Sequence, residues 1–198
     1  MSALAERLSP SITTMIRMDH THVVALFHRY KADSSASRKR ALIRNASLAL
    51  QVHAQLEEEI FYPALSAVLG SDDVLAKSEP EHNEMRRLIG ELRERTAGDG
   101  ATVDAACDDV FFELMRTVLH HVADEESRLL PAAERLLSDQ LDELGNQMTK
   151  RRIELVKPHA GEIAVSAARS FPVGTALLTV GAIAAGAMLW SLGRATRT

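Results

Sequence analysis

The feature that most constrains this 198-residue chain is a segment that occurs twice. Each copy has a histidine, three further residues, a pair of glutamates, and then a short run that a proline closes. The copies span residues 53–63 and 121–131, and in both the proline follows the histidine by ten positions and the first glutamate by six. Internal repetition indicates one structural unit used twice, and this unit contains metal-ligand residue types.

The spacing within each copy favours a metal site between helices. Residues four apart lie on the same face of an α-helix, so His53 points the same way as Glu57, and His121 the same way as Glu125. Two such pairs on facing helices supply the nitrogens and carboxylates from which helix bundles build dinuclear centres. The alternative is that each pair is an ordinary hydrogen-bonded pair on a solvated face, but the aligned repeat favours the metal site.

Apolar residues recur at helical intervals through most of the chain, and no stretch alternates long enough to predict a strand. The third helix is expected to begin near Ser78. Short connections between the first four helices predict an all-α, antiparallel up-down-up-down four-helix bundle with a C-terminal helical extension. The predicted helices cover residues 10–33, 38–69, 78–96, 102–137 and 141–156.

The first and third predicted helices each add one histidine that follows an acid, as Asp19-His20 and Glu81-His82. These two histidines could be hydrogen-bonded core residues, but their place in the repeat favours metal ligands. Each half of the chain then has a single histidine followed by a His-x-x-x-Glu pair. The six candidate ligands are His20, His53, Glu57, His82, His121 and Glu125.

With these motifs, the chain resembles the hemerythrin-like HHE cation-binding family over residues 10–155. The resemblance rests on the Asp-His of the first helix, the two repeated segments and the stretch 137–145. It implies a four-helix bundle that holds a dinuclear, non-haem iron centre. By the same resemblance, Glu57 and Glu125 would bridge the two metals. The four histidines would be terminal ligands, namely His20, His53, His82 and His121.

The chain departs from the family's oxygen carriers at two positions. Those proteins have a second histidine one turn after the third-helix histidine, where this chain has Arg86. They also have an aspartate five residues after the fourth-helix histidine, whereas Glu125 lies four residues after His121. Fewer imidazoles and an open coordination position favour reaction with peroxide, O2 or NO over reversible oxygen carriage. The resulting hypotheses are a catalase- or peroxidase-like enzyme and, alternatively, a non-catalytic iron- or gas-binding sensor or storage protein tethered to a membrane.

Acidic neighbours of the candidate ligands predict support for the imidazoles, because carboxylates commonly fix the tautomer of a ligating histidine. Arg86 is expected to pair with an acid, and a sharper hypothesis makes it a gate beside the metal. Residues offset around the helix from the ligands are expected at the surface or next to the ligands, with Glu58 or Glu126 as an alternative extra ligand. The carboxylates expected to support imidazoles are Asp19, Glu81 and Asp124, and the offset residues are Glu58, Glu59, His120 and Glu126.

Charge and cysteine content bear on the partner and on the compartment of the protein. Residues 145–198 carry seven Lys/Arg against two Glu, a net of +5, which leaves −9 on residues 1–144 given the total of −4. An acidic body argues against nucleic acid as its partner. Cys107 is the only cysteine, so no intramolecular disulfide can form and a reducing compartment is expected. The N-terminal residues lack the apolar core of a signal peptide, which favours a cytoplasmic metal-binding domain.

The C-terminal region contains an uncharged span, residues 171–192, which is long enough to cross a bilayer as one helix. The heavier basic flank precedes the span and predicts that the bundle lies in the cytoplasm, anchored by this helix. The alternative is a helix packed against the bundle or a second subunit, which leaves a homo-oligomer open. The expected organisation is a bundle at 1–145, a basic linker or helix at 146–170, and a transmembrane or packing helix at 171–193.

Overall fold

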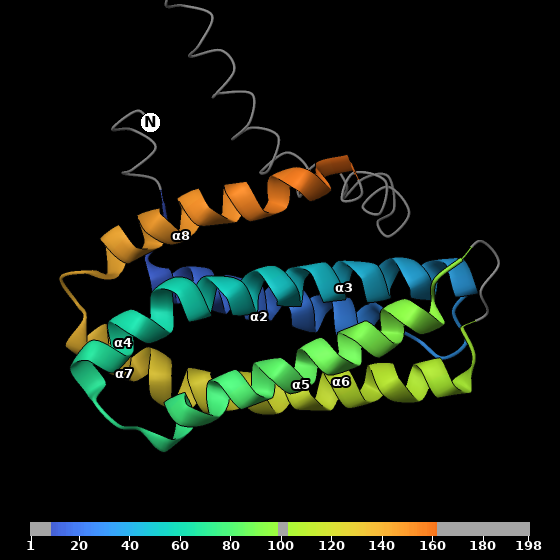
Figure 1. Ribbon diagram of the computed structural model, residues 1–198, viewed down its shortest axis with the longest axis horizontal. Coiled ribbons are helices and arrows are strands. Elements are labelled where there is room, and N and C mark those ends of the chain that lie inside the picture. The colour runs from blue at the N-terminus through green and yellow to red at the C-terminus, as the bar shows by residue number, and fades with distance from the viewer. Residues whose placement is uncertain (1–8, 99–102, 162–198) are drawn as a thin grey trace, which may run out of the picture. The chain divides into compact units, whose positions relative to one another are not determined.

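The computed structural model of the protein describes residues 9–98 and 103–161. Within these ranges every regular element is helical, and four long helical segments run antiparallel to form the expected all-α four-helix bundle (Figure 1). The second and fourth segments each contain a π-helical turn between two α-helices. In chain order the elements are α2 (Ile12–Arg29), α3 (Ala36–Leu56), η1 (Glu57–Phe61), α4 (Tyr62–Leu69), α5 (Asp73–Arg95), α6 (Ala105–Asp124), η2 (Glu125–Leu129), α7 (Leu130–Leu136), α8 (Leu141–Val156) and the 3-10 turn η3 (Lys157–His159).

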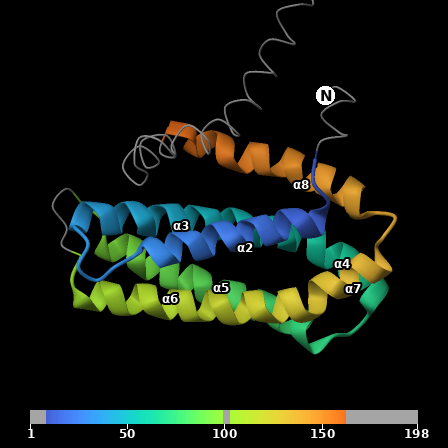
Figure 2. The same cartoon turned by 180° about the vertical axis from the view of Figure 1, so that it is seen from behind.

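The four segments of the bundle form a ring in which α2 and α5 lie diagonally across from each other. Helix α2 packs against α3 and α6, and α5 packs against the same two helices. Helix α8 packs outside this ring, against α2, α3 and η1. Figure 2, from behind, shows α8 along the α2–α3 side of the bundle. One face of the bundle therefore carries an additional helix.

The expected start of the third helix near Ser78 is wrong, because α5 already begins at Asp73. The carboxylate of Asp72 accepts hydrogen bonds from the backbone N–H groups of Val74 and Leu75, which makes it an effective N-cap. Pro80 consequently lies inside α5 rather than at its first turn. A proline removes one backbone hydrogen bond from a helix interior, and this helix continues through it.

The two repeated segments leave α-helical geometry at the same position. The N–H of Tyr62 donates to the carbonyl of Glu57, and that of Leu130 to the carbonyl of Glu125, five residues back in each case. Each wide turn begins at the repeated glutamate and ends shortly before the repeated proline. Proline lacks an N–H and crowds the preceding turn, which a π-helical turn accommodates. Such turns occur frequently at functional sites.

The buried apolar residues form two clusters, one toward each end of the bundle. Val23 and Leu50 belong to one cluster, and Ile16 and Leu56 to the other. His20 lies between Ile16 and Val23 on α2, and His53 lies between Leu50 and Leu56 on α3. The candidate ligands therefore form a polar layer that separates two apolar parts of the core.

The chain divides into two units after Pro158, and the bundle with α8 belongs to the first. The expected boundaries at 145 and 170 stay predictions. The uncharged span 171–192 lies outside the described residues. None of the helices in the described part of the chain combines the length and the apolar character needed to span a bilayer.

Gly145 of α8 gives a test of how this helix docks. A Cβ at this position would lie 2.2 Å from the carbonyl oxygen of Pro10 and 3.0 Å from the backbone N of Ile12. Because backbone cannot rotate away as a side chain can, we expect Gly145→Ala to lower the free energy of unfolding by about 1–3 kcal/mol. Chemical denaturation measures the change.

Gly90 of α5 is the matched control, because a Cβ there would meet nothing within 4 Å. Gly90→Ala should raise the free energy of unfolding by about 0.5–1 kcal/mol, since alanine is the better helix former. Equal effects of the two substitutions would contradict the close approach of α8 to the start of α2.

Candidate metal centre

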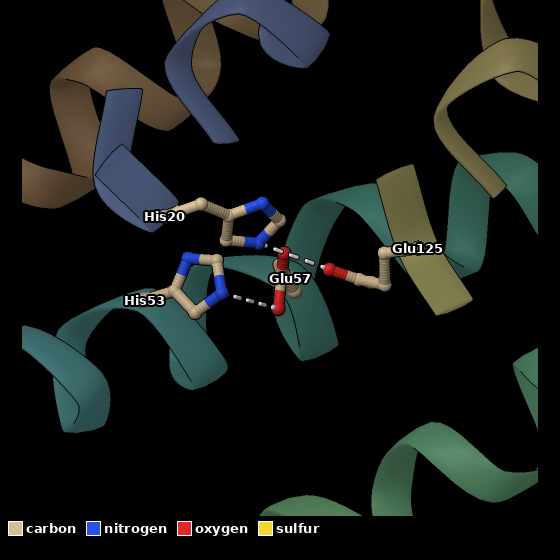
Figure 3. A group of neighbouring side chains, drawn as sticks. All are labelled: His20, His53, Glu57 and Glu125. Carbon is tan, nitrogen blue, oxygen red and sulfur yellow. Dashed lines mark ion pairs between the residues drawn. The ribbon is translucent and has the colours of Figure 1, made fainter. Parts of the chain in front are cut away.

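The structure brings all six predicted ligands into one buried layer. Each is at most 5% exposed, and Glu57, His82 and Glu125 are completely buried. Potential ligand atoms fall into two groups, and within each group they lie within 4.8 Å of one another. Glu57 belongs to both, which is the arrangement that a residue bridging two ions requires. The groups are His20, His53, Glu57 and Glu125 (Figure 3), and Glu57, His82 and His121.

Each glutamate faces one histidine from each half of the chain. Oε2 of Glu57 lies 3.2 Å from Nε2 of His53 and 3.4 Å from Nε2 of His82. Oε2 of Glu125 lies 3.3 Å from Nε2 of His20 and 3.4 Å from Nε2 of His121. In Figure 3 the imidazoles of His20 and His53, from the neighbouring helices α2 and α3, point at the two carboxylates. The Nε2 atoms of all four histidines are therefore directed inward.

The inner atoms have the properties expected of metal ligands. Buried polar atoms normally have hydrogen-bond partners. Among the described residues, the buried atoms without such a partner include Nε2 of His20 and of His53, Oε1 of Glu57 and Oε2 of Glu125. Two atoms bound to one ion at about 2.1 Å lie roughly 3.0–3.4 Å apart, which matches the separations in this layer. Imidazole and carboxylate donors together suit iron and other divalent transition metals.

A second set of carboxylates faces the outward nitrogen, Nδ1, of every inner histidine. Such a partner keeps the proton on Nδ1, so that the lone pair of Nε2 is free to bind a metal. The four contacts are His20 to Glu126 at 2.9 Å, His82 to Glu58 at 2.9 Å, His121 to Glu81 at 2.8 Å, and His53 to Asp19 at 3.4 Å.

The expected supporting roles of Asp19 and Glu81 agree with these contacts, whereas Asp124 does not contact an inner histidine in this way. Asp124 lies instead with Glu81 and His120 in an outer group of ligand-type side chains. Glu58 and Glu126 bind imidazoles from outside and are not members of the two inner groups. The structure therefore favours their supporting role over the alternative that either is an additional ligand.

The contacts of Glu58 and Glu126 with imidazoles repeat with the internal symmetry of the chain. The arginines that bind these two carboxylates do not, because Arg17 precedes His20 whereas Arg86 follows His82. Glu126 accepts from Nε of Arg17 at 3.1 Å. Glu58 accepts from Nη2 of Arg86, so the expected pairing of Arg86 with an acid is present. Burial opposes ionisation of Glu58, but the hydrogen bonds from Arg86 and His82 lower its pKa, so that its carboxylate can accept a hydrogen bond from Nδ1 of His82.

Tyr62 is a site residue that the sequence argument missed. Its hydroxyl donates to Oε1 of Glu125 at 2.8 Å and lies 3.2 Å from Oε2 of Glu57 and 3.4 Å from Nε2 of His82. The equivalent position in the second repeat is Leu130. The one difference in the sequence that could have indicated this role is that the first repeated segment has a hydroxyl where the second has an apolar side chain. Burial and the two nearby carboxylates raise the pKa of Tyr62 well above its usual value, so the hydroxyl keeps its proton.

Burial and mutual charge set the protonation of the metal-free centre. Burial disfavours the charge on His20, but the carboxylate of Glu125, 3.3 Å from Nε2, and the charge of Glu57 outweigh it and raise the pKa of His20 to about 9. Burial and the charge of Glu125 raise the pKa of Glu57 well above its usual value. Burial also opposes ionisation of Glu125, but the nearby ring of His20 and the charges of the other histidines lower its pKa to about 2. At neutral pH, His20 therefore holds a proton that a metal must displace, and a proton on the inner carboxylates is held by Glu57 in preference to Glu125.

A family model described as the hemerythrin HHE cation binding domain matches residues 11–133. The chain belongs to this family. The HHE match covers all six inner residues and ends before α8.

Two known proteins are similar to this HHE chain. The crystal structure of a hemerythrin HHE cation binding domain-containing protein from Mycobacterium kansasii matches with a TM-score of 0.61 and 19% identity, covering 82% of this chain and 99% of that one. This match shows a shared fold. A protein named DNA nickase from Nostoc sp. (strain PCC 7120) is 27% identical over 139 residues, which is 70% of this chain. The chain spans only 38% of that relative's length.

The protonation of the centre predicts how metal binding depends on pH. Because a metal must displace protons from His20 and Glu57, the affinity should rise with pH between 6 and about 9 and then level off. Each displaced proton contributes at most about tenfold in affinity per pH unit. Calorimetry of Zn2+ binding in buffers of different ionisation enthalpy counts the protons released. An affinity that is constant from pH 7 to 9 would show that these groups are already deprotonated.

Proposed function

We propose that this HHE domain holds two iron ions in the buried layer and that the iron-loaded centre reacts with peroxide, O2 or NO. The observation that carries the proposal is the pair of buried ligand groups that share Glu57 and contain polar atoms without hydrogen-bond partners. Two carboxylates and four imidazoles match the donors that dinuclear centres in helix bundles use. Iron, when bound, would supply the change of oxidation state that such chemistry needs.

The protein's own groups would orient the ligands and control protons. The Nδ1 contacts hold four imidazoles with Nε2 inward, and two apolar clusters above and below the layer keep bulk water out. Tyr62 is the one hydroxyl among the described residues that contacts the inner carboxylates. Its position beside Glu125 suits a hydrogen-bond donor to a small molecule bound in the layer.

A reactive centre is favoured over an oxygen carrier because this chain has Arg86 where the family's carriers have another histidine. Arg86 donates to Glu58 and adds no imidazole to the layer. The second candidate is a sensor or store in which iron binds without turnover. The name of the Nostoc relative describes a protein of which this chain spans only 38%, and the net charge of −9 on residues 1–144 argues against DNA as a partner of this domain.

Metal analysis tests the ligand assignment. The purified wild-type chain, loaded with ferrous iron under nitrogen, should retain two irons per molecule after desalting. His53→Ala and Glu125→Ala should each lose at least one of them, because each removes a buried donor. His28→Ala is the matched control, since His28 is exposed and bonds only the carbonyl of Val24 in its own helix among the contacts described. Retention of two irons by both ligand variants would overturn the assignment.

Tyr62→Phe separates metal binding from reaction. The variant should still bind two irons, but oxidation of the reduced protein by peroxide should slow by about 10²-fold, the lower end of the effect of removing one positioned hydrogen-bond donor. Stopped-flow absorbance measures the rate. Peroxide consumption by the wild type at no more than the rate of free iron would favour the sensor or store. A spectrum that appears with O2 and disappears when O2 is removed would indicate an oxygen carrier instead.

A further inference from the structure

Helix α8 lies beyond the residues that the family model matches, yet it reaches the centre through one side chain. Nη1 and Nη2 of Arg152 donate to the two carboxylate oxygens of Asp19, at 2.7 and 2.6 Å. A bidentate pair of this kind fixes the orientation of a carboxylate as well as its charge. Both side chains are mostly shielded, with Arg152 29% and Asp19 17% exposed. Solvent therefore competes with this contact less than with a fully exposed ion pair.

The same carboxylate faces an inner histidine. Oδ2 of Asp19, which accepts from Arg152, lies 3.4 Å from Nδ1 of His53. On the other side of the ring, Nε2 of His53 lies 3.2 Å from Oε2 of Glu57. A continuous chain of contacts thus connects α8, through α2, to a candidate ligand on α3. This is the longest of the supporting contacts, so it depends most on what holds Asp19 in place.

We propose that Arg152 is a positioning residue that holds Asp19 against His53, so that docking of α8 strengthens metal binding at the group of ligands that contains His53. This inference rests on the proposed function, because it assumes that the buried layer binds metal. If the two events are coupled, metal must stabilise the docked helix by the same factor by which the docked helix strengthens metal binding.

The rest of the molecule provides an internal comparison. The equivalent contact in the other half joins Glu81 to His121 at 2.8 Å, and there Glu81 faces the exposed His120 at 3.5 Å rather than an arginine. Helix α8 covers only the α2–α3 side of the ring. The dependence on α8 should therefore affect one ligand group and leave the group with His82 and His121 unchanged.

The neighbouring residue of α8 supplies a matched control. Arg151 donates to Glu59 of η1, with Nε to Oε2 at 2.6 Å and Nη2 to Oε1 at 3.0 Å. It has the same charge and also ties α8 to the bundle, but Glu59 is not a member of the inner groups and is a third exposed. Arg151→Gln removes a docking contact without touching the contact between Asp19 and His53.

The first measurement is ferrous iron affinity of the full chain under nitrogen, in competition with a chelator. Arg152→Gln should weaken one of the two binding events by about tenfold, the lower end of the effect of removing support from a metal-binding histidine. Arg151→Gln should stay within about twofold of the wild type. Arg152→Lys, which keeps the charge but not the bidentate geometry, should fall between them. Equal losses in Arg152→Gln and Arg151→Gln would overturn the proposal and assign both residues to docking alone.

The reciprocal measurement is hydrogen exchange of the backbone amides of α8. Iron should slow this exchange in the wild type and in Arg151→Gln, and should leave it unchanged in Arg152→Gln. Slowing of equal size in all three proteins would overturn the coupling. Absence of metal binding by the wild type would refute the proposed function itself, whereas two tight sites in every variant would refute only the role of Arg152.

Discussion

The cost of burying ionisable side chains is the constraint on which this bundle depends. Six of them lie in one layer between two apolar clusters, where an unpaired charge is strongly unfavourable. The outward atom of every histidine faces a carboxylate, although at His53 the 3.4 Å separation from Asp19 is not a hydrogen bond, and several inward atoms also have no hydrogen bond. The pKa of Glu57 is accordingly raised and that of Glu125 lowered, so that in the absence of metal a proton is favoured on Glu57 over Glu125. Metal binding would replace this arrangement, so folding and metal binding are thermodynamically linked.

Acidic and basic side chains alternate outward from the layer. Inner glutamates face imidazoles, imidazoles face supporting carboxylates, and three of these carboxylates face arginines. The arginines come from three different helices, α2, α5 and α8. Each step outward is more exposed and therefore contributes less by itself. Two of these arginines, Arg17 and Arg86, lie within the residues that the family model matches. The third, Arg152, comes from α8, which lies outside them.

Much of the fold and the six inner residues could be predicted because they rest on local geometry. The four-residue spacing of His53 and Glu57 fixes a shared helix face, and its repetition identifies the second pair. The start of α5 could not be placed because Pro80 suggests a first turn, while the cap at Asp72 decides the outcome. The contact of Tyr62 with Glu125 spans 63 positions, and that of Arg152 with Asp19 spans 133. Such contacts depend on how helices pack, which a helical pattern alone does not specify.

The two π-helical turns also affect how this domain can vary. In a regular α-helix, adding or removing one residue rotates everything beyond it by about 100°. A π-helical turn takes up one extra residue within itself, because its hydrogen bond spans five residues instead of four. Deleting one residue from η1 and restoring the regular bond would therefore leave Tyr62 and Leu65 facing nearly the same way, whereas the same deletion in a regular part of α3 would not. Relatives that retain this centre are accordingly expected to lose a residue at these turns more readily than elsewhere in the two repeated segments.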